Sequence, residues 1–171
     1  MARRPMALAA VLVPLIDHPT GLSVLLTERS VDLPDHPGQI SFPGGRLEST
    51  DADAAAGALR EAAEEIGLPA TSVEVIGYLP AHMTLTGFAV TPVVAIVTPD
   101  FEFRIDAREV SQLIEIPLSF LVDSRNQAQE ERELAGRRLR LPVFHYAGHR
   151  VCGATAIMLA DLCRHLDQQA A

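Results

Sequence analysis

The chain has 171 residues, of which 48% are hydrophobic and 21% are charged, and its formal net charge is −8. This length suits one unit with a sizeable core, so we expect residues 1–171 to form a single globular domain. The acidic balance argues against nucleic-acid or membrane-surface partners, because both kinds of surface need clustered cations. An anionic small-molecule substrate would therefore need a local cation, either a metal ion or a few arginines.

Apolar periodicity and turn residues divide the chain into strands and helices. In chain order we expect strands at 7–16 and 22–28, a Pro- and Gly-rich loop at 29–45, a helix at 50–66, strands at 73–79, 88–97 and 111–116, a helical turn at 118–122, a strand at 138–146 and a helix at 155–166. The elements mix without a regular βαβ alternation. We therefore predict an α+β fold, an α/β/α sandwich with a mixed sheet between helices.

The N-terminal segment can be interpreted as a signal peptide or as a strand, because Arg3 and Arg4 precede an apolar run as in a signal peptide. Pro14 interrupts that run and Asp17 follows it, which favours a strand. No segment approaches the roughly 18 uninterrupted apolar residues of a membrane span. We expect a cytoplasmic protein without a membrane partner, and the sequence is compatible with a homodimer.

The helix predicted at 50–66 has two different faces at about 100° per residue. Its apolar stripe consists of Ala55, Leu59, Ala62 and Ile66, and its opposite face carries Glu61, Glu64 and Glu65. The like charges repel one another, and within the helix only Arg60, four residues before Glu64, offers relief. A hard divalent cation suits such a group of carboxylate oxygens, whereas a solvated acidic surface is the plainer alternative.

The segment before this helix favours the cation. Phe42-Pro43-Gly44-Gly45 is a tight turn whose glycines let the backbone approach a metal or a phosphate, and its carbonyls can serve as ligands. From here the chain resembles the Nudix family, whose box is written G-x5-E-x7-R-E-U-x-E-E-x-G-U with U aliphatic. The matching residues are Gly45, Arg60, Glu61, Ala62, Glu64, Glu65, Gly67 and Leu68. Asp51 stands at the first acidic position, one residue further from Arg60 than the pattern has it.

The resemblance implies a metal-dependent pyrophosphohydrolase that uses Mg²⁺ or Mn²⁺. The implied metal ligands are Gly45, Glu61, Glu64 and Glu65, with Arg60 orienting Glu64. Water would attack a phosphorus of a nucleoside diphosphate linked to another group. The box does not fix the general base, and outside it we choose Glu109.

Upstream and downstream segments resemble the coenzyme A pyrophosphatase branch of this family. They are the pattern LLTxRSx3Rx3Gx3FPGG, matched over 25–45 except that Pro34 replaces its second Arg, and the stretches 86–92 and 153–156. The branch implies hydrolysis of coenzyme A or its derivatives to adenosine 3′,5′-bisphosphate and 4′-phosphopantetheine or acyl-phosphopantetheine. The 3′-phosphate would need cations, and the thiol arm an apolar groove.

The substrate-binding residues that we expect on this basis are Arg29, His36, Gln39, Phe42, Gly44 and His82. Arg29 is the first choice for the 3′-phosphate. A Nudix hydrolase acting on ADP-ribose, NADH or dinucleoside polyphosphates is the alternative, because the box fixes the chemistry and leaves the base and tail open. A catalytically silent Nudix ligand sensor is a third interpretation, disfavoured by the three retained glutamates.

Overall fold

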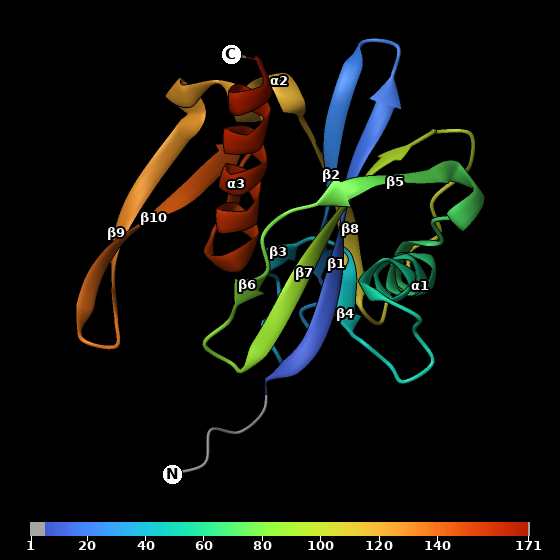
Figure 1. Cartoon of the computed structure of the whole chain (residues 1–171), viewed down its shortest axis with the longest axis horizontal. Coiled ribbons are helices and arrows are strands. Elements are labelled where there is room, and N and C mark those ends of the chain that lie inside the picture. The colour runs from blue at the N-terminus through green and yellow to red at the C-terminus, as the bar shows by residue number, and fades with distance from the viewer. Residues whose placement is uncertain (1–5, 171) are drawn as a thin grey trace.

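The computed structural model describes residues 6–170, so Arg3 and Arg4 of the signal-peptide comparison lie outside the described residues. It confirms an α+β fold in which a mixed sheet lies between helices (Figure 1). The elements are β1 (Ala7–His18), β2 (Gly21–Arg29), β3 (Ile40–Ser41), β4 (Gly44–Arg46), α1 (Ala54–Ile66), η1 (Ala70–Ser72), β5 (Val73–Tyr78), β6 (His82–Met83), β7 (Phe88–Val97), β8 (Val110–Pro117), α2 (Leu118–Val122), η2 (Ser124–Asn126), β9 (Gln127–Leu134), β10 (Arg137–Tyr146), β11 (His149–Val151) and α3 (Gly153–Ala170).

The centre of the sheet is the parallel pair β1 and β7, in register from Ala7 with Phe88 to Ile16 with Val97. The two strands predicted at the start of the chain are confirmed as β1 and β2, which form an antiparallel hairpin but pair only near their turn. Beyond it they separate, and β4 pairs with β1 while β3 pairs with β2. The segment expected to be an irregular loop therefore supplies two short strands that open the sheet at one end.

Alternate residues of β1 point to opposite sides of the sheet, as the two-residue period of a strand requires. Ala9, Val13 and Leu15 pack in a core that includes α3 and α2, whereas Ala10 and Leu12 pack in a second core that includes α1. We call these the α3 side and the α1 side of the sheet. Burial on both sides explains why β1 is an almost continuous apolar run.

Helix α1 begins later than expected, at Ala54 rather than Thr50. Asp53 caps it, since its Oδ1 accepts a hydrogen bond of 2.8 Å from the backbone N–H of Ala56. The preceding residues fold instead into a turn in which the N–H of Asp51 donates to the carbonyl of Glu48. Gly67 ends the helix as predicted, in the left-handed conformation with φ 68°.

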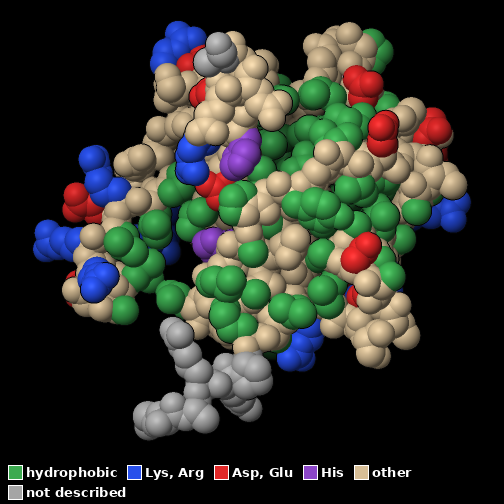
Figure 2. All heavy atoms as spheres, viewed as in Figure 1, with side chains coloured by type: hydrophobic (Ala, Val, Ile, Leu, Met, Phe, Trp, Pro, Cys, Tyr) green, Lys and Arg blue, Asp and Glu red, His purple; other side chains and the backbone are tan. Residues whose placement is uncertain are grey.

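A second, three-stranded sheet of β9, β10 and β11 was not expected in full. The sequence predicts only β10, because β9 is polar and largely exposed and so lacks the apolar alternation of a strand. The β9–β10 hairpin extends away from the main sheet, and arginine side chains gather on it in Figure 2. The arginines of this hairpin are Arg132, Arg137, Arg138 and Arg140.

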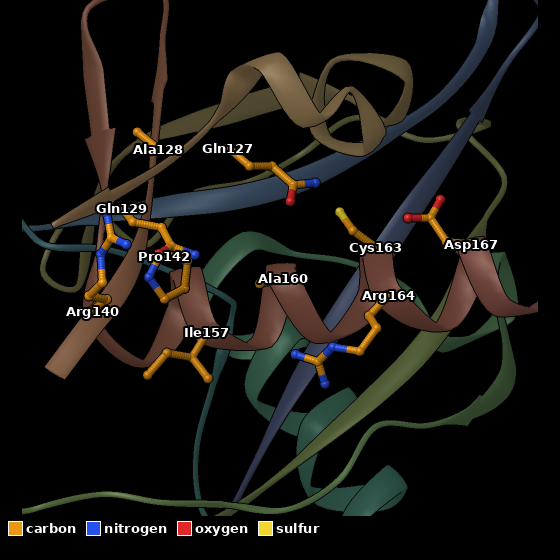
Figure 3. Close-up of a pocket in the computed structure, with 10 residues that line it drawn as sticks. All are labelled: Gln127, Ala128, Gln129, Arg140, Pro142, Ile157, Ala160, Cys163, Arg164 and Asp167. Carbon is orange, nitrogen blue, oxygen red and sulfur yellow. The ribbon is translucent and has the colours of Figure 1, made fainter.

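The base of this hairpin and α3 border a cavity of about 430 Å³, whose lining includes Gln129, Arg140 and Arg164 (Figure 3). A second cavity of about 500 Å³ lies beside the β1–β2 turn, with His18 and Glu115 in its lining. No residue from Gly45 to Leu68 lines either of them. No helix within residues 6–170 is long and apolar enough to cross a membrane.

Candidate functional site

The backbone of Gly45 lies directly against the carboxyl group of Glu61. The pairing of Ala10 with Gly45 turns this glycine toward α1. A methyl group added at Gly45 would lie 2.7 Å from both Cδ and Oε1 of Glu61, which is closer than non-bonded atoms can approach. The expectation that the glycines allow a close approach is thus met by a carboxylate of the helix itself.

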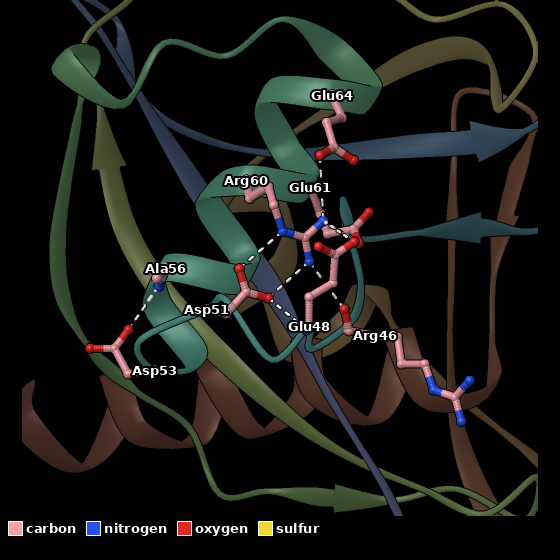
Figure 4. Close-up of polar contacts among 8 residues, drawn as sticks. All are labelled: Arg46, Glu48, Asp51, Asp53, Ala56, Arg60, Glu61 and Glu64. Atoms are coloured by element: carbon pink, nitrogen blue, oxygen red, sulfur yellow. Dashed lines mark hydrogen bonds and ion pairs between the residues drawn. The ribbon is translucent and has the colours of Figure 1, made fainter.

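Arg60 is the centre of a charged cluster beside this contact (Figure 4). Its Nε and Nη2 donate to the two carboxylate oxygens of Asp51 at 3.0 and 2.9 Å. Its Nη1 donates to Glu61 Oε1 at 3.0 Å, and the contact with Glu64 is longer, 3.5 Å. The expected ion pair between Arg60 and Glu64 is present. Asp51 holds Arg60 more closely through a bidentate contact, and Glu61 also lies closer to Arg60 than Glu64 does.

Asp51 is a positioning residue that the sequence analysis undervalued. Its side chain is only 5% exposed, and its Oδ2 also accepts from the N–H of Glu48 at 2.8 Å. The hydrogen bonds from Arg60, followed by that from Glu48, lower the pKa of this carboxyl to about 2. The same contact raises the pKa of Arg60. Asp51 is therefore ionised at neutral pH and fixes the guanidinium.

A glycine in the first turns of α1 brings this acidic loop close to the helix. A methyl group at Gly57 would lie 2.3 Å from Cδ2 of Leu47 and 3.1 Å from Oδ2 of Asp51. Gly57 is buried, and any larger residue would push the 47–51 loop outward. Gly57 was not among the residues predicted to form the site, although a glycine inside a helix is a signal for close packing.

Glu65 does not lie on a solvated face, which corrects the expected arrangement of the three glutamates. Only 6% of the residue is exposed, and it is buried together with Ala58, Ala62 and Ile66. The cause is that the 104–109 loop crosses the end of the helix, where the N–H of Asp106 donates to the carbonyl of Glu65 at 2.9 Å. The buried stripe of α1 thus includes a carboxyl group.

The surroundings of Glu65 raise its pKa to about 8. Burial is the largest cause, and the negative charges of Glu61 and Glu109 add to it. The backbone amide of Gly44 and the charge of Arg29 act in the opposite direction. Residues from four separate parts of the chain thus share one electrostatic environment.

Glu61 and Glu109 belong to the same environment. Burial is the largest cause of the raised pKa of Glu61, and the charges of Glu64 and Glu109 raise it further, although Arg60 opposes them. Glu109 is brought near by the turn before β8, where its carbonyl accepts from the N–H of Ser30 at 2.8 Å. The structure therefore places Glu109 close enough to the box glutamates to affect their charge.

This arrangement fits a hard divalent cation in its chemistry. Carboxylate oxygens of Glu61, Glu64 and Glu65 and the backbone carbonyl of Gly45 are the kind of donors that Mg²⁺ and Mn²⁺ prefer. A cation would also lower the cost of keeping a buried carboxylate such as Glu65 ionised. Within the described residues, no three acidic, His or Cys side chains are gathered at metal-binding distance.

The expected substrate residues of the 29–45 segment lie in a folded turn. The backbone N–H of Arg29 donates to the carbonyl of Gln39 at 2.9 Å, and its Nε donates to the carbonyl of Asp35 at 3.2 Å. His36 is exposed, with a left-handed φ of 52°. Gln39 reaches toward Gly153 at the start of α3. Arg29 thus faces the α1 side, whereas Gln39 faces the α3 side.

The remaining residues that we expected to bind substrate differ in how deeply they are buried. The ring of Phe42 is 2% exposed in the core on the α3 side, so we correct its assignment from substrate contact to packing. Gly44 pairs with Val11, and a methyl group there would lie 2.4 Å from the carbonyl of Ala10. His82 is half-buried on β6, opposite Val90.

Comparison with known proteins gives one consistent picture. The family model described as "NUDIX domain" matches residues 6–142. The "Uncharacterized Nudix hydrolase NudL" of Escherichia coli (strain K12) is 42% identical over 154 residues, which cover 90% of this chain and 80% of that protein. Two solved structures share the fold at 17% identity: RenU, a Nudix hydrolase from M. smegmatis, with a TM-score of 0.63 over 98% of this chain and 88% of that one, and a MutT protein from Methanosarcina mazei Go1, with a TM-score of 0.62 over 99% of both chains.

Proposed function

The chain belongs to the Nudix family of hydrolases of nucleoside diphosphate derivatives, and from this premise we propose that it hydrolyses the pyrophosphate bond of coenzyme A or its acyl derivatives. The products would be adenosine 3′,5′-bisphosphate and 4′-phosphopantetheine, or acyl-phosphopantetheine. The observation that carries the chemistry is the contact between the Gly45 backbone and the Glu61 carboxyl, beside the buried Glu65. It joins the glycine turn and the helix of the box into one oxygen-rich site.

The residues of this site divide the work. We assign the metal to the Gly45 carbonyl, Glu61, Glu64 and Glu65, where bound Mg²⁺ or Mn²⁺ would activate water and neutralise charge on the leaving phosphate. Arg60, fixed by Asp51, holds the Glu61 carboxylate in place. This is the role of the groups around a metal's direct ligands, which fix their orientation.

Two carboxyl groups are candidates for the general base. A base works best when its pKa is close to the operating pH, and the raised pKa of Glu65 meets that condition before a cation is considered. If Glu65 is bound to metal, Glu109 is a carboxyl outside the box whose charge already reaches Glu61 and Glu65. We therefore retain Glu109 as the proposed base.

The preference for coenzyme A rests on the segment before the box. In the structure this segment is ordered by backbone contacts between Arg29, Gly38 and Gln39, and it places the charge of Arg29 near Glu65. We propose that Arg29 contacts the pyrophosphate and that His36, Gln39, Gly44 and His82 line the rest of the substrate site. Arg29 is thereby moved from the 3′-phosphate, where the sequence analysis placed it.

The test is a mass-spectrometric screen of purified protein with Mg²⁺ or Mn²⁺. Coenzyme A, acetyl-coenzyme A, ADP-ribose, NADH and diadenosine polyphosphates are compared at equal concentration. We expect kcat/KM to be highest for a coenzyme A form, with 4′-phosphopantetheine or its acyl form among the products. A higher kcat/KM for ADP-ribose or a dinucleoside polyphosphate would reject coenzyme A and retain the Nudix chemistry.

A further inference from the structure

Arg46 follows the proposed metal-binding glycine and points to the other side of the sheet. Its backbone is fixed twice: β4 pairs Arg46 with Ala9, and its carbonyl accepts from Nη2 of Arg60 at 3.2 Å. Ala9 belongs to the core on the α3 side, whereas Gly45 faces Glu61 on the α1 side. Figure 4 shows the Arg46 side chain directed away from the carboxylates. One short strand thus presents a backbone to the catalytic cluster and a cation to the opposite side.

The side chain of Arg46 lies over an aromatic ring. Its guanidinium carbon is 5.8 Å from the centroid of Phe88, within the range of a cation–π contact. The strand register places His82 in the same row, because Ala9 pairs with Val90 and Val90 pairs with His82, while Ala9 and Val90 themselves are buried. Arg46 and His82 are therefore the two ends of one row across the α3 side, about 14 Å apart at the usual strand spacing.

The side chains of Arg46 and Arg29 lie in different electrostatic environments. Arg29 lowers the pKa of Glu65 and so lies near the site for the pyrophosphate. Arg46, in the part of the chain that the structure describes, contacts no carboxylate through its guanidinium, in contrast to Arg60. An exposed cation beside an aromatic ring, next to an anion-processing site in a chain of net charge −8, is suited to an anionic group of the substrate.

We propose that Arg46 is the specificity-determining residue that binds the 3′-phosphate of the adenosine half, an inference that rests on the proposed function. An adenosine 3′-phosphate carries a flat base and a phosphate on the same ribose. The guanidinium can donate two hydrogen bonds to that phosphate, and the partly buried ring of Phe88 offers apolar surface for the base. The Arg60 contact to the Arg46 carbonyl ties this recognition element to the catalytic cluster.

Direct binding tests this assignment without requiring turnover. Isothermal titration with full-length protein and saturating Mg²⁺ measures Kd for adenosine 3′,5′-bisphosphate and for AMP, which lacks the 3′-phosphate. We expect wild type to prefer the bisphosphate by about ten- to a hundredfold, the range of a charge-assisted contact. Arg46→Ala should remove that preference and leave the Kd of AMP within about twofold.

Matched variants separate this role from a structural one. Arg46→Gln keeps the length of the side chain without its charge and should behave like Arg46→Ala. Arg125→Ala removes an exposed arginine at the η2 turn and should retain the preference. Equal binding of both ligands by wild type, or an unchanged preference in both Arg46 variants, would overturn the assignment. If wild type discriminates the ligands, both Arg46 variants lose that preference, and wild type cleaves no coenzyme A form, the proposed function is rejected and the binding role of Arg46 is supported.

Discussion

The two sides of the sheet differ in how their charged side chains are partnered and buried. On the α1 side, Arg60 is held by Asp51 and Glu61, and Glu65 is buried among apolar residues of the same helix. On the α3 side, the guanidinium of Arg46 lies over the ring of Phe88, and the three-stranded sheet carries an exposed ion pair between Glu130 of β9 and Arg150 of β11. The first side is fixed in advance, which suits the catalysis that we propose for it. The second presents the exposed Arg46, which suits the substrate recognition that we propose for it.

The difference between the two sides indicates which residues the fold depends on and which residues can be replaced without affecting it. A buried carboxyl group and a bidentate ion pair reduce the freedom of the chain around them, and their removal should be felt in both activity and stability. Exposed ion pairs are weak because water screens them. Substitutions on the two sides should therefore differ in size and in kind.

The largest effect should come from the box glutamates. Glu64→Gln or Glu65→Gln removes a proposed metal ligand with little change in volume, and we expect kcat/KM to fall at least about a thousandfold, or about 4 kcal/mol. Far-UV circular dichroism should show a retained fold. The control is Glu48→Gln, an exposed carboxylate 3.6 Å from Arg60, which should keep activity within a fewfold of wild type. Normal turnover in both Glu64→Gln and Glu65→Gln would sink the metal assignment.

The next effect concerns the close approach at β4. Gly45→Ala would place a methyl group 2.7 Å from the Glu61 carboxyl and displace it, so we expect kcat to fall by about a hundredfold or more. Gly77→Ala is the matched control, because a methyl group at Gly77 meets nothing within 4 Å. Steady-state kinetics with saturating Mn²⁺ compare the two variants. Similar kinetics for both would show that the contact between Gly45 and Glu61 is not needed.

A smaller effect is expected at Asp51, which acts through Arg60. Asp51→Asn should lower kcat by about 10- to 100-fold, as loss of an orienting partner does. Its effect on stability should depend on pH, because the pKa of Asp51 is lowered from 3.8 to about 2. This contribution is fully present above about pH 4 and is lost as the pH falls toward 2. Urea denaturation of both proteins between pH 7 and pH 2.5 should show their difference narrowing below pH 4, and a constant difference would contradict the ion pair.

The smallest effect should occur on the hairpin. Glu130→Gln breaks an ion pair with Arg150 whose partners are both more than a third exposed. Since such pairs contribute little, the urea midpoint should stay within experimental error of wild type at physiological salt. A clear loss of stability would show that the hairpin supports the fold, and the contrast between the two sides would then be wrong.

Much of the fold and part of the candidate site could be predicted from the sequence. The features that could not be predicted have physical causes. The apolar runs of β1 and β7 correctly predicted these strands, because the local period of apolar residues determines them. The glycine after α1 correctly predicted the end of the helix, because its backbone freedom allows the left-handed conformation there. Burial of Glu65 could not be predicted, since it results from the 104–109 loop packing over α1. The role of Asp51 was missed because a bidentate contact depends on the turn that replaces the first expected turn of the helix.

The measurement that tests the central claim most directly is hydrolysis of coenzyme A in ¹⁸O-labelled water, followed by mass spectrometry of both products. We predict one ¹⁸O atom per turnover, located in the terminal phosphate of one product only. The reaction should require Mg²⁺ or Mn²⁺, stop with EDTA, and be lost in Glu65→Gln. Equal product formation with EDTA, or undiminished formation by Glu65→Gln, would contradict a metal-dependent site built on Gly45, Glu61, Glu64 and Glu65.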